Sequence, residues 1–211
     1  AGENITLTNA ADHSIHVTQA ASIGYGTLNI ANAGVIVGAD QADLVIDPRN
    51  ADAITFVNSG VVRAEAGGAI SLSGSGGGRF DNTAGVVEAL DGSTVRLVSN
   101  AEIAGGVFRT EGSGTILAND GTWTGFTNQG LLLVPNNGDL NIAGDIDNAG
   151  EIRLAGSTST TYFHVLADTT LSGGGRLSIT GGNNPSINRV YASSAGENIT
   201  LTNAADHSIH V

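Results

Sequence analysis

Short stretches in which apolar and polar residues alternate recur along the whole chain. In one such stretch an aliphatic residue comes two positions after a recurrent glycine, at Ile36, Val62, Val87, Ile116, Leu132 and Ile152. Uncharged and mostly small residues follow two positions later, at Gly38, Ala64, Ala89, Ala118, Val134 and Leu154. The position in between accepts either charge, as Arg63 and Glu88 show. Alternation with a period of two and one tolerant face predicts β-strands with a buried side and an exposed side.

A second apolar stretch follows these strands across a turn, and its copies cover residues 44–46, 70–72, 95–97, 140–142 and 177–179. One turn position in between is Asp40, Ala66, Asp91, Asp120 or Asn136. Aspartate and asparagine suit such a position because their short side chains bond to nearby backbone and tolerate turn conformations. Each unit is therefore predicted to be strand, turn, strand, glycine-rich turn and strand. No window has the period of an amphipathic helix.

An asparagine near the start of each unit, usually in an Asn-x-Gly signature, forms a column of its own. Its members are Asn9, Asn32, Asn58, Asn82, Asn128, Asn148 and Asn203. The residue two positions earlier is large and apolar, which gives a core column of Leu7, Ile30, Phe56, Phe80, Phe126, Ile146 and Leu201. Asparagines stacked at one inward-turning corner are expected to hydrogen-bond to the backbone and to each other, since buried polar groups need partners.

Units of about 24 residues with like residues at like positions predict a coil that returns to the same place one rung further along. The competing β-propeller needs about forty residues and four antiparallel strands a blade, and these units are about half that length. We therefore expect an all-β fold, a right-handed parallel β-helix (solenoid) with about eight rungs per 194-residue period. The right-handed sense is expected because parallel crossover connections almost always take it.

Residues 1–17 and 195–211 are identical, both reading AGENITLTNAADHSIHV. The sequence thus divides into one complete repeat period of about eight rungs, 1–194, and the start of the next period, 195–211. We interpret this as a window on tandem repeats in a longer polypeptide; the alternative is a fragment that assembles head to tail without a covalent link. At about 4.8 Å a rung, one period advances roughly 38 Å. The two identical segments are expected to share one conformation and to differ by a translation with little rotation.

Composition narrows the range of partners. The net charge is −12 and the eight basic residues, all arginine, form no cluster, which excludes a typical nucleic-acid or anionic-membrane surface. No run approaches the eighteen or so apolar residues of a membrane span, and residues 1–20 lack the regions of a signal peptide. Any export signal or anchor is therefore expected outside this sequence. The absence of cysteine suits a bacterial secreted surface protein.

Candidate catalytic groups are carboxylates near the turns, Asp40, Asp91 and Asp120, with Glu65, Glu88 and Glu111 nearby. Paired carboxylates could cleave polysaccharide, but these acids occupy positions that turns prefer, so a structural role is favoured and no catalysis is expected. Arg63 and Glu88 share an outward column in successive rungs and are expected to form a cross-rung ion pair of little weight at an exposed surface.

Candidate metal ligands are few. The turns at 119–121 and 136–139 carry Asn and Asp at irregular spacing, so we expect no cofactor and keep Ca²⁺ as the weaker alternative. His13, His16 and His164 are too scattered for a metal site and favour surface or cross-rung polar contacts. The glycine-rich run 74–78 carries no lysine and is interpreted as a tight corner between rungs.

The stretch FDNTAGVVEALDGSTV at 80–95, with SGSGGGR before it and GGVF at 105–108 after it, resembles the repeats of autotransporter and filamentous-haemagglutinin-like β-helices and similar tandem-repeat bacterial surface proteins. The resemblance implies a secreted, elongated fibre at the cell surface or in the extracellular space, used in adhesion, biofilm or surface coating. Expected partners are further copies of the repeat, in tandem or end to end, and also polysaccharide or neighbouring cells. The alternative function is a β-helical passenger domain that binds or cleaves polysaccharide.

Overall fold

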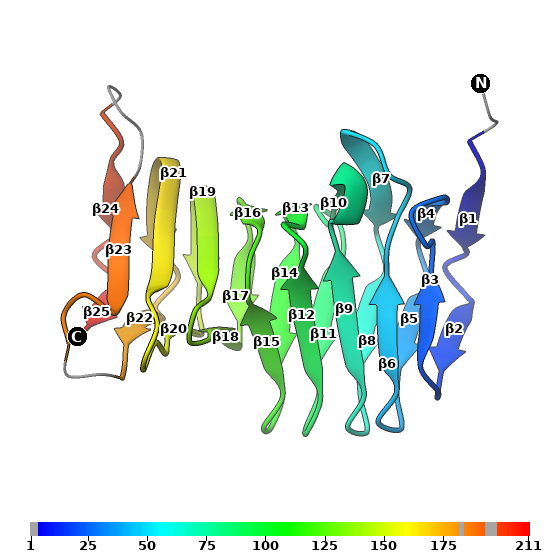
Figure 1. Ribbon diagram of the computed structural model, residues 1–211, viewed down its shortest axis with the longest axis horizontal. Coiled ribbons are helices and arrows are strands. Elements are labelled where there is room, and N and C mark those ends of the chain that lie inside the picture. Colours follow the sequence, from blue (N-terminus) through cyan, green and yellow to red (C-terminus); the bar gives the residue numbers. More distant parts are fainter. Residues whose placement is uncertain (1–3, 182–183, 193–197) are drawn as a thin grey trace.

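The chain folds into a solenoid of parallel β-strands, as the computed structural model shows for residues 4–181, 184–192 and 198–211. Every strand pair in it is parallel, and each coil contributes a strand to each of three sheets. In Figure 1 the coils follow one another along the long axis, from the blue N-terminal end to the red C-terminal end. The predicted all-β parallel solenoid is therefore confirmed, and the described helical structure is limited to one short turn, η1 (Ser75–Gly77).

The first sheet contains β1 (Thr6–Asn9), β4 (Asn29–Asn32), β7 (Ala53–Asn58), β10 (Gly78–Asp81), β13 (Glu102–Ala104), β16 (Thr122–Thr124), the first parts of β19 (Asp139–Asn148) and β21 (Thr161–Ser172), and β23 (Asn188–Ala192). The second sheet contains β2 (Ser14–Val17), β5 (Val35–Gly38), β8 (Val61–Ala64), β11 (Val86–Ala89), β14 (Val107–Thr110), β17 (Thr127–Gln129), the later parts of β19 and β21, and β24 (Leu201–Asn203). The long strands β19 and β21 join the two sheets.

The third sheet has nine strands, one a coil: β3 (Ala21–Ile23), β6 (Asp43–Ile46), β9 (Ala69–Ser73), β12 (Thr94–Val98), β15 (Thr115–Ala118), β18 (Leu131–Val134), β20 (Glu151–Leu154), β22 (Arg176–Ile179) and β25 (Ser208–His210). We call the bend from the first to the second sheet the first corner. The bend from the second to the third sheet is the second corner, and the return to the first sheet is the third corner.

The core is built from inward side chains that stack in register from coil to coil. On the first sheet the strand register aligns Leu7, Ile30, Phe56, Phe80, Ile103, Trp123, Ile142 and Val165. On the third sheet it aligns Leu44, Ile70, Val95, Ile116, Leu132, Ile152 and Leu177. Most of these side chains are fully buried. Leu7 is half-buried because no described coil covers the N-terminal face of its coil.

The aliphatic column that the sequence predicted is wrong as a single column. Ile36, Val62 and Val87 lie on the second sheet, whereas Ile116, Leu132 and Ile152 lie on the third. The core column divides in the same way, since Phe80 lies on the first sheet and Ile146 pairs with Leu171 on the second. The physical reason is that strand, turn and strand look alike at each corner, so counting residues from the glycine does not identify the corner.

The two identical segments share their local structure but not their place in the coil. Both fold as strand, turn and strand, with matching turn bonds from His13 N to Ala10 O and from His207 N to Ala204 O, each 3.0 Å long. The first copy lies on the first and second sheets, and the second copy lies on the second and third. The expectation of little rotation is therefore wrong. The predicted boundary between 194 and 195 lies outside the described residues.

Candidate functional site: two asparagine ladders and their surroundings

The first asparagine ladder runs along the first corner through four coils. Asn9 donates from Nδ2 to Oδ1 of Asn32, Asn32 to Asn58, and Asn58 to Asn82, each over 2.7 Å. The same amide nitrogens also donate to backbone carbonyls of the next coil, at Val35, Val61 and Val86. All four asparagines are buried. The amide nitrogens of Asn9, Asn32 and Asn58 therefore each donate to two oxygens of the next coil, which supplies the hydrogen bonds that buried polar groups need.

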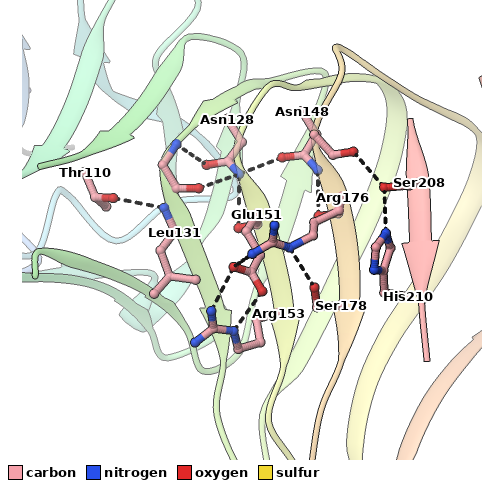
Figure 2. Close-up of polar contacts among 12 residues, drawn as sticks. Thr110, Asn128, Leu131, Asn148, Glu151, Arg153, Arg176, Ser178, Ser208 and His210 are labelled. Atoms are coloured by element: carbon pink, nitrogen blue, oxygen red, sulfur yellow. Dashed lines mark hydrogen bonds and ion pairs between the residues drawn. The ribbon is translucent and has the colours of Figure 1, made fainter. Parts of the chain in front are cut away.

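The second ladder lies at the second corner, not the first. Asn128, on β17, donates from Nδ2 to Oδ1 of Asn148 over 2.8 Å, and also to the backbone carbonyls of Gly130 and Glu151. Asn148 in turn donates to the carbonyl of Arg176 over 3.0 Å. Figure 2 shows Asn128 and Asn148 side by side, with Glu151 and Arg176 next to them. The predicted asparagine column is thus two ladders on different corners.

His207 extends the second ladder across a coil that carries no asparagine there. That coil has Gly173 after β21, and His207, from the following coil, reaches past it so that Nε2 lies 2.9 Å from Asn148 Nδ2. Its Nδ1 lies 2.6 Å from Asn203 Oδ1. The amide nitrogen of Asn148 can only donate, so Nε2 must accept and Nδ1 must carry the proton. The contacts therefore select one neutral tautomer of an imidazole that is 5% exposed.

Burial lowers the pKa of His207, and the nearby carboxylate of Asp206 opposes that shift. A protonated ring would present a proton to the Asn148 amide in place of an acceptor. His13, the same residue in the first copy, is 72% exposed and lies 3.9 Å from Asp12. The same histidine is thus either a surface group or a ladder member, depending on whether a coil precedes it.

The two ladders are separated by a tight glycine pair and an aromatic cluster. Asn82 ends the first ladder by donating to the carbonyl of Gly105 over 3.5 Å. Gly106 has a φ of +76°, and a Cβ there would lie 2.1 Å from the Asn82 amide nitrogen. Behind them Phe108 packs on Trp123 with ring centroids 4.6 Å apart. Sequence reasoning missed this cluster, although Phe108 in place of the aliphatic Val87 of the preceding coil was a signal of aromatic packing in the core.

A buried carboxylate joins three coils on the outer side of the second sheet. Glu88 is paired in register with Arg63 and Arg109, and both guanidinium groups bond to it, with Arg63 Nε 2.5 Å from Oε1. The cross-rung pair of Arg63 and Glu88 is confirmed. Its expected exposure is wrong, because the Glu88 side chain is 0% exposed under the two arginines. Long arginine stems on both sides cover it.

A second arginine–glutamate cluster lies on the third sheet near the C-terminal end. Arg153 donates to both oxygens of Glu151, at 2.9 and 2.8 Å, and Arg176 donates to Oε2 at 2.7 Å (Figure 2). The bonds from Arg153 and then Arg176 outweigh burial and lower the pKa of Glu151 to about 2. With Ser178 and His210 these groups line an open depression of about 530 Å³. The guanidinium groups are thus already engaged by a carboxylate of the protein.

The predicted carboxylate column does not assemble. Asp40, Ala66 and Asp91 lie at the second corner, whereas Asp120 and Asn136 lie at the third. Asp91 accepts from the backbone and the hydroxyl of Ser113, both at 2.8 Å, and these bonds lower its pKa. Asp120 accepts from the backbone nitrogen of Asn100 at 3.2 Å. Glu111 is an exposed turn residue, and Glu65 lies 3.7 Å from His16. Asp91 and Asp120 therefore make the hydrogen bonds that aspartates make in turns.

The turns considered for Ca²⁺ do meet at the third corner. Asn119, Asp120, Asn136 and Asp139 line one open depression, and burial raises the pKa of Asp139. Within the described ranges, however, no group of three or more histidine, cysteine or acidic side chains is arranged to hold a metal ion. His164 lies on the neighbouring strand β21, where its charge acts on Asp139, its Nδ1 is 2.7 Å from Asn141 Oδ1 and its ring stacks on Tyr191. The polar and stacking contacts of His164 are therefore cross-rung contacts between β19, β21 and β23.

Comparison with protein-family models, with curated proteins and with solved structures finds no match to this chain. Among the described residues, no helix has the length and hydropathy needed to cross a membrane.

Proposed function

We propose that this chain is a structural repeat of a secreted, elongated surface or extracellular fibre, of the adhesin, biofilm or surface-coating type, and that it performs no catalysis. The observation that carries the proposal is the repeated segment, which forms the same strand, turn and strand at both ends of the solenoid. A protein made of such periods lengthens by adding coils, since each coil contacts only its neighbours.

The polar groups support a structural role. The asparagines bond to neighbouring coils, and within each arginine–glutamate cluster the arginines pair with the glutamate of that cluster. Asp91 and Asp120 accept from turn backbone and stand at different corners. A polysaccharide-cleaving site would need two carboxylates facing one substrate bond.

The test is made on the native protein. Antibody to residues 1–211 should label intact producing cells from outside, and the labelled polypeptide should be much larger than the 21.1 kDa of this chain. A native polypeptide of about that mass would refute covalent tandem repeats, and label confined to permeabilised cells would refute the surface location. The purified chain should release no reducing or unsaturated ends from acidic polysaccharides. Release that Asp91→Ala or Asp120→Ala abolishes would establish the enzyme instead.

A further inference from the structure

The place of the repeated segment fixes how a second period would follow the first. Each turn of the coil visits the three sheets in order, and the third sheet counts nine coils. Residues 6–9 form the first-sheet strand of the first coil, and residues 201–203, the copy of residues 7–9, lie on the second sheet in the ninth coil. One period of 194 residues therefore spans about eight and a third turns, not eight.

The two copies of the segment together show both of its edges in use. As residues 6–17, it pairs with the coil that follows it, through β1 with β4 and β2 with β5. As residues 201–210, it pairs with the coil that precedes it, through β24 with β21 and β25 with β22. One edge of the segment is satisfied in each place. The sequence is therefore able to serve as an internal coil with neighbours on both sides.

We infer that a second copy of the 194-residue period continues from the surface formed by β23, β24 and β25, with residues 195–211 as its first 17 residues. The coils of this second copy are turned by about a third of a turn around the axis. The residues after position 17 of that copy would follow Val211 in space. Its Asn29–Asn32 strand would pair with β24 as β4 pairs with β1. This inference rests on the proposed function, and it adds the geometry of the junction.

The ladders supply an independent reason for this geometry. The second ladder ends at Asn203, which corresponds to Asn9, the first member of the first ladder. In the stacked arrangement Asn203 would donate to Asn32 of the second copy, as Asn9 donates to Asn32 here. The second ladder of one period thus becomes the first ladder of the next. The change of corner between Asn82 and Asn128 within each period produces the turn of one third.

A chain of three or more periods would then have a threefold screw axis. Each period would advance about 40 Å at the usual spacing of parallel strands, and a given surface group would return to the same side every third period, after about 120 Å. Any ligand bound by one exposed face would be presented on three sides of the fibre. A repeat whose period contained a whole number of turns would present the ligand on one side only.

The test uses six tandem periods followed by residues 195–211, with Gln129→Cys in each period. Gln129 is an exposed strand residue on β17 and the natural sequence has no cysteine, so a maleimide-gold label marks one azimuth a period. Electron tomography should show labels that step by about 40 Å along a rod and by about a third of a turn around it. Labels on one side of an intact rod would overturn the screw and leave the fibre standing. Compact particles in place of rods would refute both the fibre and the screw.

Discussion

Asn58 lies inside the first asparagine ladder, where its replacement measures how much the ladder stabilises the fold. Its Oδ1 accepts from Asn32 at 2.7 Å, and its Nδ2 donates to Asn82 at 2.7 Å. The side chain is 1% exposed, so Asn58→Ala leaves groups that water cannot reach. Loss of two short hydrogen bonds costs about 1 kcal/mol each, and the buried Asn82 oxygen left without its ladder donor costs about 1–3 kcal/mol more. We expect the free energy of unfolding to fall by about 3–5 kcal/mol.

The assay is thermal and urea unfolding followed by circular dichroism, with Gln129→Ala as the matched control. Gln129 carries the same amide on a neighbouring sheet but is exposed, so its removal should change stability by less than about 0.5 kcal/mol. For a chain of this length, the Asn58→Ala loss corresponds to a fall in Tm of roughly 10 °C. If the two variants unfold within about 0.5 kcal/mol of each other, the ladder does not stabilise the solenoid and the reasoning is refuted.

Three further variants probe the corners and the charges. Gly106→Ala should destabilise the fold by several kcal/mol, because its Cβ would clash with Asn82. The control Gly92→Ala has a similar φ of +72° but open space around it, so it should cost only about 1–2 kcal/mol for the left-handed backbone. Equal losses of stability in the two variants would contradict the clash. Glu88→Ala should lower the free energy of unfolding by about 2 kcal/mol. This loss is smaller than that for breaking a fully buried ion pair, because the partner arginines are partly exposed. The exposed control Glu111→Ala should change the free energy of unfolding little. The lowered pKa of His207 means that the folded chain prefers the neutral ring. The contribution of the ring to the free energy of unfolding is therefore complete above pH 6.5 and declines as pH falls through the lowered pKa. His207→Ala should remove this pH dependence of stability in urea unfolding between about pH 7 and 5, and an unchanged pH dependence would exclude His207 as its source.

The sequence was sufficient to predict the strands, the turns and the asparagines, because each is a local pattern. Period-two alternation identifies a strand wherever it lies, and Asp91 in its turn makes the backbone bonds expected of such a residue. The buried pairing of Glu88 exceeded what alternation could predict, since the cover comes from Arg109 one coil further on.

The assignment of columns to sheets could not be read from the sequence. From Asn82 to Asn128 the chain makes two full turns and a third more, and no local signature distinguishes that from two turns. The same limit hid the role of His207, since its partner Asn148 is 59 residues away. Gly105 and Gly106 take the place of the asparagine at the first corner of their coil, but only the three-dimensional packing shows that the first ladder ends there.

Disulfide formation within the intact 211-residue chain, which has no natural cysteine, reports directly whether the second copy of the repeated segment lies on the second sheet. Thr170 and Thr202 are register partners on β21 and β24, so Thr170→Cys with Thr202→Cys places the two Cα atoms about 5 Å apart, within disulfide range. An exact eight-turn repeat would instead bring Leu201 beside Val165 on the first sheet, and Thr202 beside Leu166. We predict rapid oxidation of the Thr170/Thr202 pair and none of a Leu166→Cys/Thr202→Cys pair, scored by mass spectrometry without reductant. The opposite result would contradict the extra third of a turn in each 194-residue period.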